Sequence, residues 1–312
     1  MKVSTISLHQ QEQCDRDLCA CIGYFDGLHR GHQALLDKTI ELAEQYGCES
    51  ALITFSPDPW ITTGKAQKVR HLTTMTQRIA LAEKRGIERV IILDFTAEMA
   101  ALPPEEFTEM LLRRCRLKAL VCGFDFHYGA RGKGNADSLR QEAAGRFEVA
   151  VIEAVSDEQG KISSSRISRC IEEGAVEDAR RLLGYPYEIE GTVIHGRHKG
   201  SQWGFPTANL DYSDEMILPL RGVYIGRAES GPQRWMAMIN IGHNPTCNPV
   251  RQLSVEAHLL DCSQDLYGCP LRLFFYRRIR PEQRFDSLEE LLEQLQRDRQ
   301  AVRDYFQEHD DE

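Results

Sequence analysis

The pattern of hydrophobic residues changes near Gly184, and this change constrains the fold more than any other feature of the 312-residue chain. Before Gly184, short apolar runs alternate with segments that carry apolar residues on one helical face, such as Leu36, Ile40 and Ala43. The apolar runs are residues 18–22, 51–55, 90–95, 119–122 and 149–155. Continuous apolar strands separated by amphipathic helices predict βαβ units around a parallel sheet, an α/β domain.

After Gly184 the apolar segments become shorter and follow one another more closely. They are rich in β-forming residues and bounded by Gly, Pro and Asn, and they comprise residues 187–196, 222–228, 234–242, 253–260 and 271–280. Several closely spaced strands of this kind predict an antiparallel β-barrel.

A helix is predicted at the end of the chain. Ser287 and Glu290 have the spacing of a capping box, and an apolar stripe follows at Leu288, Leu291, Leu292 and Leu295. The junction between the α/β and barrel parts is predicted at the "LGYPYE" stretch. We therefore expect two domains, residues 1–184 and residues 185–312.

Charge and cysteine content limit the classes of function. The net charge is −9, so we expect no general binding to nucleic acid or membrane surfaces, which requires basic patches. The ten cysteines include no C-x-x-C pair, which argues against a zinc ribbon and a secreted disulfide framework. The first thirty residues show no signal-peptide pattern, and no apolar stretch approaches the length of a membrane span. A cytoplasmic location is the expectation.

The stretch "CIGYFDGLHRGH" follows the first apolar run and places His29 and His32 where a helix is predicted to begin. A helix N-terminus presents free N–H groups and a partial positive charge, which favour phosphate. Gly27 and Gly31 allow the backbone to approach a ligand closely. A phosphate site is therefore one interpretation. Two histidines three residues apart also fit a metal pair, and a purely structural role is the third possibility.

Two later segments suggest further phosphate contacts. "CGFDFHYGARGKGNADSL" alternates glycine with basic residues, which indicates either a loop that covers an anion or a solvated surface turn. "ISSSRISRC" places Ser163 and Ser164 just before a helical pattern, with Arg166 beside them. These serines fit helix N-caps, and they fit donors to phosphate oxygens equally well.

Together, "FDGLHRGH", "GFDF-x-YG" and "ISSSRI" resemble the N-terminal module of bacterial bifunctional riboflavin kinase/FAD synthetases, a Rossmann-like domain of the nucleotidylyltransferase superfamily. The resemblance implies transfer of AMP from ATP to FMN with release of pyrophosphate. It implies catalytic roles on the ATP phosphates for His29 and His32, and a place for Asp125 near the flavin or the metal. The ATP-binding residues that it implies are Gly23, Phe25, Asp26, Gly27, His29, His32, Ser163, Ser164 and Arg166.

Three positions depart from that family's pattern. Tyr24 stands where a small or amide residue is usual, Asp58 stands where a histidine is expected, and Ser168 stands where an arginine is expected. A missing phosphate-directed arginine removes a contact worth roughly 1.5–3 kcal/mol, and a carboxylate near polyphosphate repels it. An alternative is therefore a monofunctional riboflavin kinase with a scaffold-like N-terminal module.

The second candidate site lies in "GTVIHGRHKGSQWGFPTANL", a glycine-rich basic stretch that is either a phosphate cradle or a basic hairpin loop. Downstream, Val255, Ala257 and Leu259 alternate with Glu256 and His258, so these last two share the other face of a strand. If that face lines a pocket, Glu256 is positioned to act as a general base. If the face is solvated, Glu256 has no such role.

The ordered set "GFPTAN", "GVY", "NIG-x-x-PT", "VEAHLLD" and "DLYG" resembles the riboflavin kinase module of the same enzymes. The resemblance implies that Thr207 and Asn209 bind Mg²⁺ together with the ATP phosphates, while Gly196 and Gly200 shape a flap over ATP. Glu256 would take the proton from the riboflavin hydroxyl as it attacks the γ-phosphate. Ser201 departs from the family, which has an arginine there.

The resemblance covers nearly the whole chain and implies riboflavin, FMN and ATP as substrates, with Mg²⁺ as the cofactor. A monomer or weak homo-oligomer is the expected assembly. A third interpretation, from another class, is a non-catalytic protein that senses flavin or nucleotide.

Overall fold

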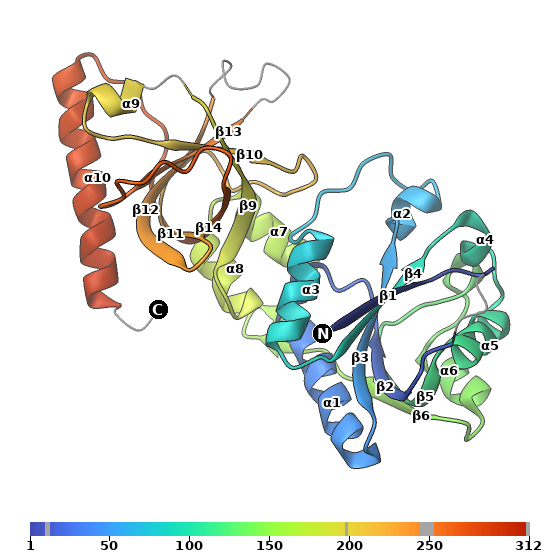
Figure 1. The fold of residues 1–312 in the computed structure, drawn as a ribbon. Coiled ribbons are helices and arrows are strands. Elements are labelled where there is room, and N and C mark those ends of the chain that lie inside the picture. The colour runs from blue at the N-terminus through green and yellow to red at the C-terminus, as the bar shows by residue number, and fades with distance from the viewer. Residues whose placement is uncertain (10–12, 197–198, 244–252, 310–312) are drawn as a thin grey trace. The chain divides into compact units, whose positions relative to one another are not determined.

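The computed structural model describes residues 1–9, 13–196, 199–243 and 253–309 (Figure 1). These residues form two compact units, Met1–Ser164 and Ser165–Glu312. The first contains an open parallel sheet, and the second contains a closed antiparallel barrel. The predicted α/β and β-barrel architectures are both confirmed.

The sheet of the first unit has six parallel strands in the order β1-β4-β3-β2-β5-β6 (Figure 1). Their bounds are β1 (Lys2–Ile6), β2 (Asp17–Ile22), β3 (Glu49–Ser56), β4 (Arg89–Asp94), β5 (Arg116–Gly123) and β6 (Glu148–Ile152). Five of these strands coincide with the predicted apolar runs. The edge strand β1 was not predicted, because its sequence KVSTI is mostly exposed and has no continuous apolar run.

Both faces of the sheet are covered by helices, which explains why its inner strands are mostly apolar. Leu18 and Ala20 of β2 belong to a core with α5 (Pro104–Arg114) and α6 (Ala136–Ala143). Cys19 and Cys21 belong to a second core with α1 (Arg30–Tyr46) and α3 (Met75–Lys84). Successive side chains of a strand point to opposite faces, so a strand between two helix layers needs apolar residues at every position.

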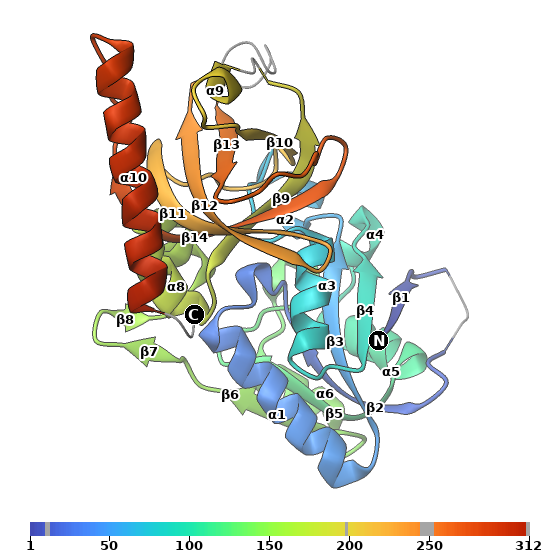
Figure 2. The same ribbon diagram turned by 60° about the vertical axis from the view of Figure 1, so that its left-hand side comes forward.

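The strand order places the candidate phosphate segments together. The chain proceeds from β2 through β3 to β4 in one direction and from β5 to β6 in the other, so the order reverses between β2 and β5. Ligands of open parallel sheets bind beyond the carboxyl ends of the strands at such a reversal. The loops that follow β2 and β5 both begin there. The β7–β8 hairpin (Ser156–Asp157 and Gly160–Lys161) extends from the end of β6 (Figure 2).

The second unit is a six-stranded barrel in the order β10-β13-β12-β11-β14-β9. Its strands are β9 (Tyr187–Ile194), β10 (Ala208–Tyr212), β11 (Gly222–Ser230), β12 (Gln233–Gly242), β13 (Ser254–Leu259) and β14 (Pro270–Arg280). Five were predicted. β10 was missed because Asn209 and Asp211 interrupt its apolar pattern, so the sequence suggested only a turn.

Helices complete the second unit. The first two are α7 (Ser164–Glu172) and α8 (Val176–Leu183). The second of these, α8, packs against β9 and β14. The predicted terminal helix is α10 (Leu288–Glu308), and the Ser287 hydroxyl accepts a hydrogen bond from the Glu290 N–H at 3.2 Å. Its contacts with the barrel come mainly from Val302, Tyr305 and Phe306. The predicted apolar stripe is confirmed at Leu292 and Leu295, which pack against the same hydrophobic core, and is wrong at Leu288, which is 42% exposed.

Candidate functional sites

The β2–α1 loop, residues 23–29, has an unusual backbone. Phe25, Gly27 and Leu28 have φ values of 57°, 78° and 35°, which curl the chain into a 3₁₀ turn. For Phe25 and Leu28 this conformation costs about 1–3 kcal/mol each, so surrounding contacts must hold it. The Phe25 ring is buried against Gly23, where an added Cβ would lie 3.2 Å from the ring.

The two histidines meet at the N-terminus of α1. His29 is the N-cap, and its Nδ1 accepts a hydrogen bond from the His32 N–H at 3.3 Å. The two rings stack with centroids 3.7 Å apart. Since Nδ1 of His29 accepts an N–H, the proton of its neutral ring lies on Nε2, which is then available as a donor. Among the described residues, the buried Nδ1 of His32 has no hydrogen-bond partner.

Both histidines are neutral at pH 7. Burial lowers the pKa of His29 to about 4. The pKa of His32 lies well below its ordinary value, chiefly because of burial and then because of the neighbouring His29 and Arg78. In the free protein the pair therefore offers hydrogen-bonding groups, and positive potential comes from the helix N-terminus.

The "ISSSRI" segment reaches the same place. The Ser164 hydroxyl donates to the Asp26 carbonyl at 2.9 Å. The Ile162 carbonyl lies 3.7 Å from the position of a Cβ added to Gly31, so this glycine accommodates a close neighbour. Ser163 directly precedes Ser164. Arg166 and Ser168 lie on α7 in the second unit, and a contact of Arg166 with phosphate stays a prediction.

The predicted flavin residue Asp125 follows β5 and forms an ion pair with Lys161. The Lys161 ammonium also lies 4.7 Å from the centre of the Phe124 ring, and its charge contributes to the lowered pKa values of both histidines. Lys161 was not identified from the sequence, although it stands two residues before Ser163. The structure thus adds a cation to the site.

Two of the departures from the family pattern contact each other. The Tyr24 hydroxyl donates to Asp58 Oδ2 at 2.7 Å, and Asp58 Oδ1 accepts the Trp60 N–H at 2.7 Å as the N-cap of α2 (Pro59–Thr62). His71 Nε2 lies 3.6 Å from the same carboxylate. Asp58 is thus buried, and each of its carboxylate oxygens accepts a hydrogen bond from within the protein.

Asp26 anchors the β2–α1 loop to the segment before α3. Its buried carboxylate accepts the backbone N–H groups of Leu72 and Thr73 at 3.0 Å each, together with the Thr73 hydroxyl. That hydroxyl oxygen also accepts the Gly27 N–H at 2.9 Å. Nucleotide contact by Asp26 stays a prediction, since its carboxylate already serves these donors. Thr73 was missed because nothing in the local sequence links it to the loop.

At the second site, strand pairing brings the predicted residues together. Asn209 of β10 and Asn240 of β12 pair with Glu256 of β13 from its two sides. Cross-strand neighbours share a face, so two amides flank the carboxylate. Val255 and Ala257 are buried, as the predicted alternation requires. Asn240 belongs to the recognised "NIG" motif, but sequence reasoning assigned it no role.

Two glycines fit closely around this site. A Cβ added to Gly196 would lie 2.2 Å from Asn209 Nδ2, and one added to Gly200 would lie 2.2 Å from the Phe205 carbonyl oxygen and 3.8 Å from Thr207 Cγ2. The glycines thus border both predicted Mg²⁺ ligands. Residues 197–198 of the basic stretch and the "PT" of the "NIG-x-x-PT" motif lie outside the described residues.

His258 supports this site from the strand that carries Glu256. Its ring is buried, with Nδ1 2.9 Å from the Pro206 carbonyl oxygen and the Phe205 ring 5.1 Å away. Burial lowers its pKa, which favours the neutral ring. The contacts with residues 205–206 fix the turn that leads to Thr207.

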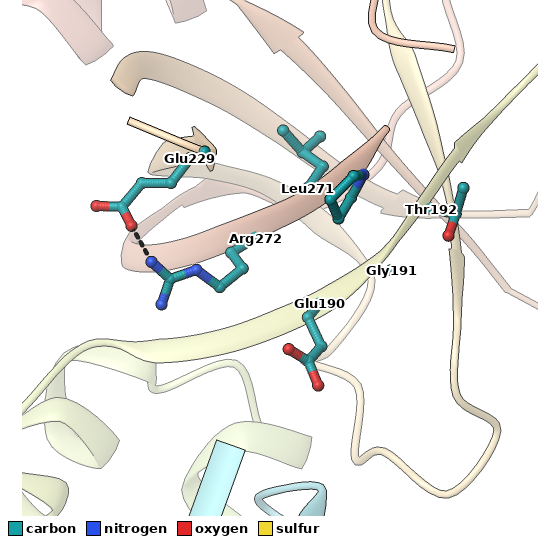
Figure 3. A pocket seen from close by; sticks show the side chains of 8 residues that line it. Glu190, Gly191, Thr192, Glu229, Leu271 and Arg272 are labelled. Carbon is teal, nitrogen blue, oxygen red and sulfur yellow. Dashed lines mark hydrogen bonds and ion pairs between the residues drawn. The ribbon is translucent and has the colours of Figure 1, made fainter. Parts of the chain in front are cut away.

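A separate pocket of about 520 Å³ opens on the barrel between β9, β11 and β14 (Figure 3). Glu190, Glu229 and Arg272 are its charged lining residues, and Arg272 is paired with Glu229 and lies 3.7 Å from Glu188. It contains none of the predicted kinase residues. The ion pairs of Arg272 are therefore with glutamates of the barrel, Glu229 and Glu188.

No group of three or more His, Cys, Asp or Glu side chains in the described ranges has the geometry to hold a metal ion. The described helices also include none that combines the length and apolar character needed to cross a membrane.

Comparison with protein families divides the chain in two. A family model described as FAD synthetase matches residues 11–166, and one described as riboflavin kinase matches residues 183–306. The two matches have the order predicted from the sequence motifs.

Curated relatives match over almost the entire chain. The bifunctional riboflavin kinase/FMN adenylyltransferase of Listeria monocytogenes is 35% identical over 309 residues, covering 97% of this chain and 98% of that protein. The Bacillus subtilis protein of the same name is 36% identical over 288 residues, covering 91% of each chain. A solved Streptococcus pneumoniae structure, described as a macrolide-efflux protein, is 32% identical with a TM-score of 0.87, covering 96% of this chain and 98% of that one.

Proposed function

The chain belongs to the bifunctional riboflavin kinase/FMN adenylyltransferase family, and we propose that residues 1–184 carry the adenylylation and residues 185–312 the phosphorylation. The protein phosphorylates riboflavin to FMN with one ATP and adenylylates FMN to FAD with a second ATP. The observation that carries this conclusion is the presence of both family matches in one chain, at 31–36% identity to bifunctional relatives. It favours the bifunctional enzyme over the monofunctional kinase and over the non-catalytic sensor.

For adenylylation, the stacked histidines support a phosphate site at the N-terminus of α1. A phosphate oxygen of FMN attacks the α-phosphorus of ATP, the bond to the β-phosphate oxygen breaks, and pyrophosphate leaves. Nε2–H of His29 donates to a phosphate oxygen, while His32 lies beside it on the first turn. This chemistry needs positioning and charge stabilisation, not a covalent nucleophile.

The other residues proposed for adenylylation would complete this site. Ser163, Ser164 and Arg166 would bind phosphate, and the free N–H groups of α1 would add donors. The backbone of Gly23, Phe25, Asp26 and Gly27 would line the adenine nucleotide. Asp125 would approach the flavin from the loop after β5.

For phosphorylation, the position of Glu256 between two amides supports its role as general base. Its carboxylate accepts the proton of the terminal ribityl hydroxyl while that oxygen attacks the γ-phosphorus, and ADP leaves. Gly196 and Gly200 would hold the adjoining flap close to Thr207 and Asn209.

The donor set fits Mg²⁺, which is a hard cation that prefers oxygen ligands. Asn209 supplies an amide oxygen and Thr207 a hydroxyl, and Mg²⁺ commonly takes its other ligands from phosphates and water. When bound, the ion would neutralise charge on the phosphates. Cytoplasmic location, the absence of nucleic-acid partners and a monomer or weak homo-oligomer remain predictions from the sequence.

The proposal is tested by incubating the pure protein with ATP, Mg²⁺ and either riboflavin or FMN, and by resolving the flavins by chromatography. Riboflavin should give FMN and then FAD, and FMN should give FAD. His32→Ala should block only the second conversion and Glu256→Gln only the first. Loss of FMN formation in His32→Ala, or loss of FAD formation from FMN in Glu256→Gln, would refute the assignment of the sites.

A further inference from the structure

Arg78 is a buried arginine next to the β2–α1 loop, and its guanidinium is incompletely paired. The residue lies on α3 and is 3% exposed. Within the described part of the chain, its Nε has no hydrogen-bond partner, and its Nη2 lies 3.8 Å from Asp26 Oδ1. A buried cation with one unpaired donor among the described residues is unfavourable for folding, so its presence calls for a compensating role.

The guanidinium contacts two residues of the loop, Tyr24 and Asp26. Its carbon lies 4.7 Å from the centre of the Tyr24 ring, and its Nη1 lies 3.5 Å from the hydroxyl oxygen of Thr54, which itself donates to the Tyr24 carbonyl at 3.0 Å. Arg78 therefore reaches the residues on both sides of Phe25.

These contacts lie on both sides of a residue with a strained backbone. Phe25 has a left-handed conformation that non-glycine residues adopt only when their surroundings enforce it. Asp26 is held by Leu72 and Thr73, and Tyr24 is held by Thr54. Arg78 joins these two anchors, because its guanidinium reaches both the Thr54 hydroxyl and the Asp26 carboxylate.

The Tyr24 ring is also fixed on its remaining sides. Its hydroxyl is bound by Asp58, and Trp60 packs edge-on with ring centroids 4.9 Å apart. With Arg78 over one face, the ring has little freedom to rotate. The position of the Tyr24 ring is therefore set by Asp58 at its hydroxyl and by Arg78 over its face.

We propose that Arg78 is a positioning residue for adenylyl transfer, which holds the β2–α1 loop through Tyr24, Thr54 and Asp26 in the shape that receives the ATP phosphates. The inference rests on the proposed placement of the adenylylation site at His29 and His32. Arg78 is buried and acts through the loop.

The test compares full-length Arg78→Gln and Arg78→Lys in FMN adenylylation, with ATP and FMN varied separately. For Arg78→Gln, kcat/KM for ATP should fall about tenfold or more, the scale expected for lost charge-assisted contacts, while KM for FMN stays unchanged. Arg78→Lys keeps the charge but not the forked geometry, so it should recover part of the loss. Riboflavin phosphorylation by the same preparations should be unaltered.

Arg85→Gln is the matched control, since this partly exposed arginine at the end of α3 pairs only with Asp37 among the interactions described. It should leave both activities unchanged. If Arg78→Gln fails to fold, Thr54→Val and Arg78→Lys preserve bulk at the site and should still raise KM for ATP. Unchanged kcat/KM for ATP in a folded Arg78→Gln, or equal rises in KM for ATP and FMN, would overturn the inference.

His32→Ala separates this inference from the site assignment. Normal FAD synthesis by His32→Ala would show that the proposed site itself is wrong. Loss of FAD synthesis in His32→Ala, together with normal kinetics in Arg78→Gln, would reject only the role of Arg78.

Discussion

The two candidate sites differ in how the backbone holds their functional side chains. The β2–α1 loop contains left-handed residues and depends on hydrogen bonds from Leu72 and Thr73, which lie far away in the sequence. At the candidate kinase site, Asn209, Asn240 and Glu256 are neighbours because three antiparallel strands pair in register. One site is maintained by tertiary anchors, and the other is maintained by the ladder of the barrel.

This difference predicts different sensitivities. The first site should respond to the loss of a single anchoring side chain, since a strained loop relaxes when its anchors are removed. The second should tolerate changes in distant contacts but not atoms that intrude between paired strands. The predictions below test this contrast, beginning with the largest effect.

Glu256→Gln should lower kcat of riboflavin phosphorylation by about 10²–10⁴-fold, because the amide cannot accept the hydroxyl proton. Riboflavin binding should persist, since the side chain keeps its size. Steady-state kinetics and fluorescence titration with riboflavin measure the two effects. Glu215→Gln, at an exposed position before β11, is the control, and unchanged turnover in Glu256→Gln would refute the base assignment.

His29→Ala should lower FAD synthesis by about 10²–10³-fold, because it removes the Nε2 donor and the N-cap of α1 together. Conversion of riboflavin to FMN should continue at its normal rate. Chromatographic assays on one preparation give both numbers. A parallel loss of FMN formation would contradict the independence of the two sites.

Gly196→Ala should lower kinase activity by about 10²-fold, since the added methyl group would displace the Asn209 side chain. A double-mutant cycle with Asn209→Ala tests the cause. If Gly196 acts through Asn209, adding Gly196→Ala to Asn209→Ala should produce little further loss. Fully additive losses would show that the glycine acts through another contact.

The last prediction concerns stability rather than activity. The pKa of His29 is lowered from 6.5 to about 4, so the unfolded chain binds a proton in this range before the folded chain does. The free energy of unfolding should therefore fall as pH decreases from 6.5 to about 4, by about 3 kcal/mol for this group. His29→Gln should reduce that pH dependence in urea unfolding at several pH values. Identical pH dependence in both proteins would contradict this origin.

The sequence predicted those strands of the parallel sheet that carry a continuous apolar run. β2 through β6 in the first unit are apolar enough to be recognised without tertiary information. β1 and β10 were missed because an edge strand and a strand that carries Asn209 have polar positions that local pattern cannot distinguish from a turn. The register of β10, β12 and β13 determines which residues flank Glu256. Of the two flanking amides, the sequence predicted a role only for Asn209.

Residues that act across long sequence separations were not predictable. Thr73, Arg78 and Lys161 lie in segments without a recognised motif, and each acquires meaning only when folding brings it to the loops after β2 and β5. The partnership of Tyr24 with Asp58 is of the same kind. The sequence marked both as departures, but only the structure shows that one hydroxyl binds the other's carboxylate.

The stacked neutral histidines have a consequence for the proton balance of nucleotide binding. At the proposed site, ATP would bring negative charge beside two unprotonated imidazoles, and an adjacent anion raises the pKa of a histidine. Binding should therefore take up protons from the solvent, increasingly as the pH is lowered toward the pKa of the complex. The measured heat of ATP binding should then depend on the ionisation enthalpy of the buffer, and its affinity should rise in mildly acidic solution.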